Sequence, residues 1–430
     1  MRILILSKKN YNVFWKGNNQ VKKPSHVLAN RSFLYLWIGE SISELGGAIG
    51  ALCNSLWLYE LTGSKSAMGT LWLTYFIPSL LVQLFIGPMI DRVSRKHVML
   101  SSQVIRSMVF FSPVILMFSG HMEIWILFVI QAILGILQPL YVPAASALLP
   151  TIAAENQLMQ MNAWMDGTVR TMSFLAPTIG GIVAAYLGTP SAYIVVGMLF
   201  LLSTISLFYL KEPMLKQQEQ KIPWLKQVLV GYRYFFKQKQ LIWLGFFTSL
   251  VQFSVGVTMV INVPYVLEEL KGTSFTYGLF MGGFPLGYIV GSFLVGKWGS
   301  KGARRYIMLS GLLMGGLSFL LLGFVDFIPL AILCEFLGGV CFPFFNVHQT
   351  TLYQKTIPTE LMGQIFSVRL FLIQVTMPLG VLFAGQVVDL YGIRLLYMMI
   401  GSLIIIPALF ALTLPFFSFL NEEKKEFSNM

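Results

Sequence analysis

The chain has 430 residues, of which 56% are hydrophobic and only 11% are charged. Soluble domains carry about 25% charged residues, so this composition excludes an ordinary soluble globular protein. The net charge of +12 could suggest nucleic-acid binding, but the basic residues lie between apolar segments and form no aromatic-rich basic domain. Composition therefore indicates an all-α, polytopic membrane protein that contacts the lipid bilayer and binds no nucleic acid.

Apolar segments of about 20 residues or longer recur along the chain and predict twelve membrane-spanning helices. We expect a cytoplasmic tail at 1–30, a six-helix bundle at 31–210, a cytoplasmic linker at 211–240, a second six-helix bundle at 241–419 and a tail at 420–430. The linker is equally compatible with an interfacial helix and with a solvated segment. The expected spans are 33–59, 67–90, 98–118, 123–144, 160–186, 190–210, 241–267, 275–296, 305–325, 327–350, 364–389 and 393–419.

The distribution of Lys and Arg predicts the orientation of these spans. If the N-terminus is inside, 24 basic residues lie in cytoplasmic segments, and outside lie only Lys65, Lys271 and Arg394. Because basic loops stay on the cytoplasmic side, both termini should be cytoplasmic.

The most specific motif joins the second and third spans and reads Gly87-Pro-Met-Ile-Asp91-Arg92-Val-Ser-Arg95-Lys96. The second half repeats its spacing without a gap, as Gly296-x-x-x-Ser300-Lys301-x-x-Arg304-Arg305. Such an echo argues for a duplicated chain, and duplicated transporters typically enclose a substrate site between their halves.

This loop resembles the signature between helices two and three of the major facilitator superfamily. The segments Pro143-Ala-Ala-Ser-Ala-Leu-Leu-Pro150 and Pro177-Thr-Ile-Gly180-Gly181 are more narrowly similar to bacterial macrolide-efflux-like drug:proton antiporters. The resemblance implies a fold of two six-helix repeats, alternating access, and a gating loop made by Gly87, Asp91, Arg92, Arg95 and Lys96.

Pro177, Gly180 and Gly181 match the core of the antiporter motif of span five, where they form either a pivot or an ordinary close contact. The sequence departs from the family at Gln131 and Gln364, where Arg is usual. These departures put the details of proton coupling in doubt.

Charged residues inside a span cost about 2.5–3.5 kcal/mol by insertion scales and are functional candidates by default. Asn162 extends the polar stripe of span five by one turn. The candidates are Glu40, Glu44, Arg106, Asn162, Asp166, Arg170, Glu335 and Arg369.

Glu44 is the first candidate for a proton carrier, because it lies roughly 18 Å into its span, near the middle of a ~30 Å core. Asp166 is second. It can pair with Arg170 four residues later, in a proton-linked or a purely structural ion pair. Glu40 is expected nearer the cytoplasmic end, where hydration alone would explain it. Glu335 is expected to face Glu44 across the halves.

No phosphate-binding loop, nucleophile–base pattern or metal-ligand spacing is present, so we expect neither a cofactor, a metal nor an enzymatic activity. The sequence therefore predicts a monomeric exporter that moves amphipathic or hydrophobic small molecules against protons. Two alternatives remain open: an exporter of one defined metabolite, such as a siderophore or lysophospholipid, and a non-transporting membrane sensor.

The predicted topology can be tested by labelling single cysteines placed at Lys226 and Lys65 in a chain whose three native cysteines are replaced. An impermeant maleimide added outside the cell should modify Lys65→Cys and spare Lys226→Cys until the membrane is opened. External labelling of Lys226→Cys would contradict the cytoplasmic linker.

Overall fold

A computed structural model describes residues 27–421, apart from 63–64, 155, 214–222 and 299–303 and the side chains of some helical residues, Pro177 among them. The expected counterpart of the gating loop around Ser300 and Lys301 therefore lies outside the described residues, as do most of both tails. Within the described residues, all regular structure is helical. This is the outcome expected where lipid offers the backbone no hydrogen-bond partners.

Thirteen α-helices of six residues or more make up most of the described chain. In chain order they are Arg31–Thr62 (α2), Lys65–Phe85 (α3), Gly87–Arg92 (α4), Arg95–Phe118 (α5), Ile124–Ile152 (α6), Leu158–Phe208 (α7), Trp224–Lys237 (α8), Lys239–Pro264 (α9), Ser274–Trp298 (α10), Arg304–Leu322 (α11), Ile328–Thr356 (α12), Met362–Tyr391 (α13) and Ile393–Thr413 (α14). Short helical turns at Val27–Ala29, Tyr265–Glu269, Thr359–Leu361 and Pro415–Leu420 complete the described chain.

Nine helices within the described residues are long and apolar enough to cross a membrane, and Thr70–Phe85 forms a shorter apolar helix. The predicted spans missing from these nine are the first, the second and the fifth. The first and fifth carry pairs of charged residues within the span, Glu40 with Glu44 and Asp166 with Arg170. The structure thus shows a polytopic helical protein, while the count of twelve spans stays a prediction.

The fifth and sixth predicted spans form one continuous element, α7, with a sharp break. Gly188 has a φ of 78°, which a residue with a Cβ rarely adopts, and it divides α7 at the predicted boundary. Gly392, between α13 and α14, has the same φ of 78°. The two breaks therefore use the same residue and the same backbone conformation.

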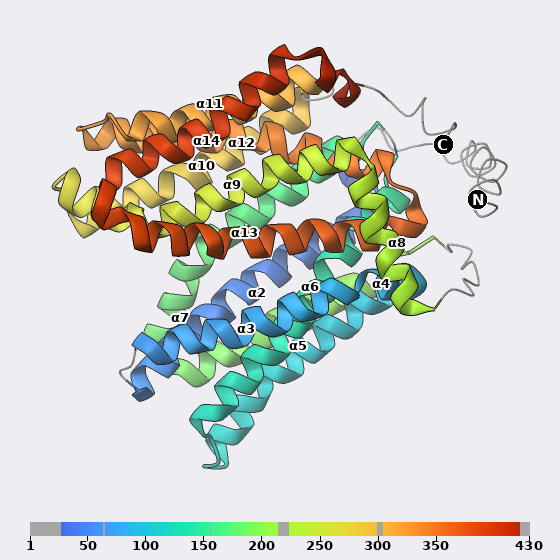
Figure 1. Cartoon of the computed structure of the whole chain (residues 1–430). Coiled ribbons are helices and arrows are strands. Elements are labelled where there is room, and N and C mark those ends of the chain that lie inside the picture. Colours follow the sequence, from blue (N-terminus) through green and yellow to red (C-terminus); the bar gives the residue numbers. More distant parts are fainter. Residues whose placement is uncertain (1–26, 63–64, 155, 214–222, 299–303, 422–430) are drawn as a thin grey trace.

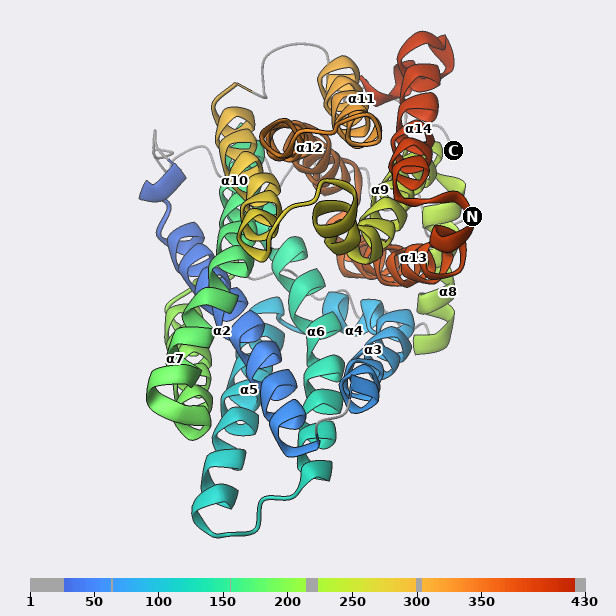
Figure 2. The ribbon, with the colours of Figure 1, turned by 90° about the vertical axis from the view of Figure 1, so that its left-hand side faces the viewer.

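The helices form two groups that meet along one side of each (Figure 1). Helices α2 to α7 pack mainly with each other, and α9 to α14 form the second group. Between the groups, α13 lies beside α3, α4 and α6, and α10 lies beside α7 (Figure 2). The helix alternative describes the linker better than a solvated segment does, because α8 spans Trp224–Lys237 and packs on α4, α9 and α13. We call the end of the molecule where α4 and α8 lie the α8 end.

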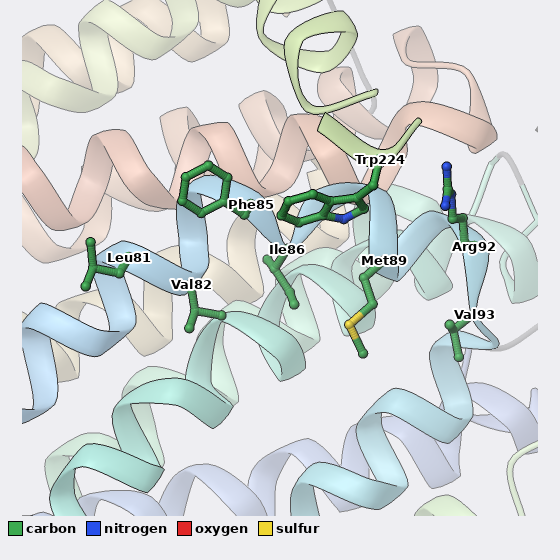
Figure 3. Close-up of a pocket in the computed structure, with 8 residues that line it drawn as sticks. All are labelled: Leu81, Val82, Phe85, Ile86, Met89, Arg92, Val93 and Trp224. Carbon is green, nitrogen blue, oxygen red and sulfur yellow. The ribbon is translucent and has the colours of Figure 1, made fainter. Parts of the chain in front are cut away.

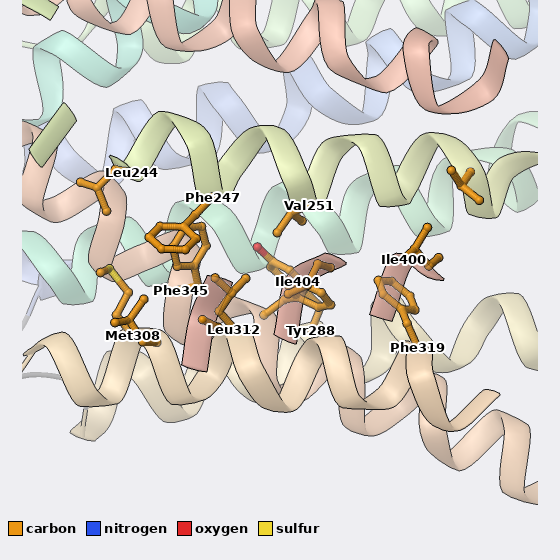
Figure 4. Packing of buried hydrophobic residues seen from close by; sticks show 14 of the residues in the cluster. Leu244, Phe247, Val251, Tyr288, Met308, Leu312, Phe319, Phe345, Ile400 and Ile404 are labelled. Carbon is orange, nitrogen blue, oxygen red and sulfur yellow. The ribbon is translucent and has the colours of Figure 1, made fainter. Parts of the chain in front are cut away.

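Aromatic and aliphatic side chains fill the interior of the second group. Phe247 of α9 lies beside Phe345 of α12, with ring centroids 6.2 Å apart. Leu312 and Met308 of α11 face them from the other side (Figure 4). This packing holds α9, α11 and α12 together, and hydrogen bonds from Gln349 and Tyr353 of α12 to α9 add to it.

Glycines let pairs of helices approach until their backbones touch. A Cβ on Gly287 of α10 would lie 1.9 Å from the carbonyl oxygen of Phe336, and one on Gly339 of α12 would lie 2.1 Å from that of Phe284. Close backbone approach through small residues is a main source of helix association in lipid, where no hydrophobic force draws helices together. The α10–α12 pair therefore depends on both glycines.

The α9–α13 pair is built the same way and gives a test. A Cβ on Gly380 would lie 2.1 Å from the carbonyl oxygen of Phe253, whereas one on Gly385 of the same helix would meet nothing within 4 Å. We expect Gly380→Val to destabilise the protein by about 1–3 kcal/mol through overpacking and Gly385→Val to cost much less. Melting curves of the two purified variants decide this, and equal losses would contradict the packing.

Candidate functional site

The contact between the two groups at the α8 end centres on Asp91 of α4. Its Oδ1 accepts a hydrogen bond from the backbone N–H of Gly363 at 2.7 Å, and its Oδ2 accepts one from Gln364 at 3.1 Å. Both amides belong to the first turn of α13, which begins at Met362. First-turn amides have no partner within their helix, and the helix dipole favours an anion there. Asp91 thus supplies the hydrogen-bond acceptors that the first-turn amides of α13 lack within their own helix.

The surrounding glycines bring three helices to this point. A Cβ on Gly87 of α4 would lie 2.5 Å from the Cα of Gln364, and one on Gly231 of α8 would lie 2.6 Å from its Oε1. A Cβ on Gly363 would lie 2.8 Å from Oδ1 of Asp91. A side chain on Gly87, at the start of the predicted gating loop, would therefore collide with the backbone of α13.

Arg95 extends the same contact. Its guanidinium is 2% exposed and donates to the carbonyl oxygens of Ala147 at 2.8 Å and Thr359 at 2.7 Å, so it joins α5 to α6 and to the turn before α13. It also lies 3.8 Å from Oδ1 of Asp91. Burial raises the pKa of Asp91 to about 7, even though Arg95 and the two amides act in the opposite direction. We call Asp91, Arg95, Gly363 and Gln364 the latch.

Lys96 and the start of α5 are held within the first group. The ammonium of Lys96 donates to the carbonyl oxygen of Phe208 at 2.7 Å, and the N–H groups of Arg95 and Lys96 donate to the carboxylate of Glu212 at 3.0 and 3.2 Å. The Ser94 hydroxyl also donates to Glu212. Arg92 is exposed on the outer face of α4.

The second group repeats this arrangement. The N–H of Arg305, which aligns with Lys96, donates to Oδ1 of Asn421 at 2.9 Å. The Arg305 guanidinium donates to the carbonyl oxygen of Ala411 at 2.7 Å, near the end of α14. Sequence analysis missed Glu212 and Asn421 because each lies far along the chain from the helix it caps.

Asn162 makes a second bridge between the groups. Its side-chain amide donates to the hydroxyl of Thr351 at 3.0 Å and to Oε1 of Gln354 at 2.6 Å, both on α12. Gln354 in turn donates to the carbonyl oxygen of Ser146 at 3.0 Å. Asn162 is buried, so this network lies out of contact with solvent.

Glu44 and Arg106 belong to a polar cluster inside the first group. Oε1 of Glu44, which is half-buried, accepts a hydrogen bond from the hydroxyl of Ser173 on α7 at 2.7 Å. Arg106 of α5 donates to Oε1 of Gln138 on α6 at 2.8 Å, as expected of a side chain that pairs with a neighbouring helix. The hydration of Glu40 stays a prediction: the residue is half-buried, and its Oε2 is buried without a hydrogen-bond partner where α2 packs on α6 and α7.

Asp166 and Arg170 share a face of α7 but form no ion pair. No nitrogen–oxygen distance between these two described residues falls within 4.0 Å. Arg170 instead lies over the ring of Tyr288 on α10, 5.1 Å from its centroid, and the hydroxyl of Tyr288 accepts from Asn346 at 2.7 Å. Oδ2 of Asp166 is buried without a hydrogen-bond partner, while Arg170 is exposed. Tyr288 was missed because an aromatic residue in an apolar span gives no polar signal.

The remaining charges lie in the second group. Arg369 of α13 donates to the hydroxyl of Thr350 on α12 at 2.9 Å. Glu335 is buried at 7% exposure against α10, where a Cβ on Gly283 would lie 3.2 Å from its own Cβ. Glu335 thus packs beside α10, and its expected position opposite Glu44 stays a prediction.

The antiporter-like motif is explained only in part by packing. A Cβ on Gly180 would lie 3.1 Å from Cγ2 of Ile49, so this glycine lets α7 approach α2 closely. A Cβ on Gly181 would meet nothing within 4 Å, and the side chain of Pro177 lies outside the described residues. Among the described residues, no group of three or more His, Cys, Asp or Glu side chains could hold a metal ion.

The latch predicts how Asp91→Asn should behave. The change removes the charge that α13 attracts, and a hydrogen bond to a charged group contributes about 1.5–3 kcal/mol, so the ratio of closed to open molecules should fall about tenfold or more. A cysteine at Ser367, buried behind the latch at 3% exposure, should then react with maleimide correspondingly faster. Asp326→Asn, an exposed acid in another loop, is the control, and equal rates in all three proteins would refute the gating role.

With this geometry known, comparison with other proteins identifies the family. The model of the Major Facilitator Superfamily matches residues 36–261 and 248–428. Macrolide efflux protein A of Streptococcus pyogenes is 23% identical over 386 residues, covering 88% of this chain and 94% of that protein. Multidrug resistance protein MdtG of Salmonella paratyphi C is 24% identical over 409 residues, covering 90% and 96%.

Solved structures agree in fold. The crystal structure of the human organic anion transporter MFSD10 has a TM-score of 0.70 at 15% identity, covering 90% of this chain and 99% of that one. A bacterial homologue of the iron transporter ferroportin, in its outward-facing state, has a TM-score of 0.68 at 18% identity, covering 88% and 97%. The chain therefore belongs to the Major Facilitator Superfamily of membrane transporters.

Proposed function

We propose that this chain exports amphipathic or hydrophobic small molecules in exchange for protons, by alternating access between its two helix groups. Relatives named for macrolide efflux and multidrug resistance match it over most of its length, which supports export of this substrate class. The observation that carries the coupling proposal is Glu44, a half-buried carboxylate that touches α7 through Ser173. No catalytic role is proposed for any residue.

Glu44 can link a proton to the movement of the groups. As an anion it attracts the Ser173 hydroxyl, and protonation weakens that hydrogen bond because a charged acceptor is roughly twice as strong as a neutral one. Ser173 lies on the same helix as Arg170, which contacts Tyr288 of the second group. Protonation of Glu44 would thus weaken its contact with α7, the helix that packs on α10 at the boundary between the two groups.

Glu40 strengthens this choice. It lies one turn before Glu44, and its Oε2 is buried without a hydrogen-bond partner. A buried carboxyl oxygen that no hydrogen-bond donor reaches is available to bind a proton. Asp166 remains the second candidate, since its Oδ2 is also buried without a partner.

The latch supplies the gate in this scheme. With Asp91 bound to the first turn of α13, the α8 end is closed, and this contact must break before the α8 end can open. We propose that the α8 end is the cytoplasmic end, in accord with the excess of basic residues in its loops.

One observation favours the alternative of a defined anionic metabolite. Arg170 is exposed although it lies midway along the first part of α7, at the boundary with α10. A guanidinium held there could bind a carboxylate or phosphate of the cargo. A non-transporting sensor has no comparable support.

Transport by inverted vesicles tests the proposal. Uptake of a fluorescent amphipathic cation should require a proton gradient and stop when a protonophore is added. Glu44→Gln cannot exchange a proton, so it should lose pH-driven uptake while keeping substrate binding. Glu268→Gln, an exposed carboxylate outside the cluster, should transport normally.

Three other outcomes would change the assignment. Normal pH dependence in Glu44→Gln, with loss in Asp166→Asn, would move the proton to Asp166. Uptake of anions alone, lost in Arg170→Gln, would favour the metabolite exporter. Uptake that persists after the protonophore would refute proton coupling.

A further inference from the structure

An apolar groove of about 730 Å³ lies on the outer face of α3 and α4, at the α8 end (Figure 3). Leu81 and Phe85 of α3 and Met89 of α4 line it, and Trp224 of α8 stands over its middle. The rings of Phe85 and Trp224 are tilted toward each other with centroids 5.7 Å apart. The groove therefore lies across three helices: the end of α3, the short helix α4 that carries Asp91, and the linker helix α8.

The walls of the groove are exposed and face away from the protein. Leu81 is 57% exposed, Met89 41% and Trp224 40%, so no described part of the chain covers them. A contiguous exposed apolar surface marks a binding site in a soluble protein, and in a membrane protein it faces lipid. The groove is thus a depression in a lipid-facing surface, with room for acyl chains.

One end of the groove is basic. Arg92 is the one charged side chain among the described residues that line it, and it lies at the end away from Leu81 (Figure 3). Trp224 lies between the two ends, as amphipathic rings do at the level of lipid headgroups. An apolar trough that ends in a guanidinium complements a molecule with acyl chains and a phosphate, because arginine binds phosphate through two parallel hydrogen bonds.

We propose that this groove binds an anionic phospholipid from the surrounding leaflet, with its acyl chains along Leu81 and Phe85 and its phosphate at Arg92. The site lies on the outer face of α3 and α4 and does not rest on the proposed substrate or coupling. It has a structural consequence for the latch, because α4 carries both Arg92 and Asp91. A lipid bound across α4 and α8 would hold together the two helices that pack on Gln364 and so favour the closed latch.

Native mass spectrometry of the full-length protein tests the site, with phosphatidylglycerol and phosphatidylcholine of identical acyl chains as probes. The wild type should retain more phosphatidylglycerol. Arg92→Gln should lower that preference about fivefold, the effect of one basic residue near an anionic headgroup. Lys237→Gln, an exposed basic residue on α8 outside the groove, should keep it.

A second variant and a second probe locate the lipid independently. Trp224→Ala should reduce binding of both lipids, and phosphatidylglycerol with a photoactivatable acyl chain should label the peptide that contains residues 81–93. Labelling elsewhere only, or an unchanged preference in Arg92→Gln together with unchanged binding in Trp224→Ala, would overturn the proposal. Equal stabilisation of the protein by soluble glycerol phosphate would also overturn it. A dimer that Trp224→Ala abolishes would do the same, because it would assign the groove to a second copy of the chain.

Discussion

The arrangement of the two helix groups depends on one contact, in which the carboxylate of Asp91 accepts hydrogen bonds from the first turn of α13. Both sides need it. The amides of Gly363 and Gln364 have no partner in their own helix, and a buried carboxylate is costly unless it is hydrogen-bonded. Such a contact is strong when closed, yet it can be exchanged for water when the groups separate. It suits an element that must alternate between two states.

The same constraint governs the charges inside the helix groups. A charge in a low-dielectric interior must find donors, acceptors or aromatic faces, and here it finds them on neighbouring helices. Arg95 reaches the carbonyl of Ala147, Arg106 reaches Gln138, and Arg170 lies over Tyr288. Glu40 and Asp166 each keep one buried carboxyl oxygen without a hydrogen-bond partner. Unsatisfied carboxyl oxygens are where a proton would be expected to bind.

The two groups also echo each other in details that no motif search would find. Glu212 and Asn421 follow the last helix of their groups and cap α5 and α11. Gly188 and Gly392 break the chain at corresponding points with the same positive φ. These parallels support the hypothesis of duplication, and they show that the second half keeps the architecture without an acidic counterpart of Asp91 in its sequence.

The sequence by itself determined the class of protein, the positions of most helices and the charged motif at 87–96, because apolar length and the spacing of charges are local properties. It also indicated the family, which the comparisons showed. It failed where partners come from distant segments. The four-residue spacing of Asp166 and Arg170 suggested an ion pair, but Tyr288 competes for the guanidinium from another helix. The depth of Glu40 along α2 did not predict that one of its oxygens is buried, because that depends on the packing of α6 and α7 against α2. Only the tertiary structure brought α13 to Asp91 and Trp224 to Phe85, since each contact joins segments more than 100 residues apart.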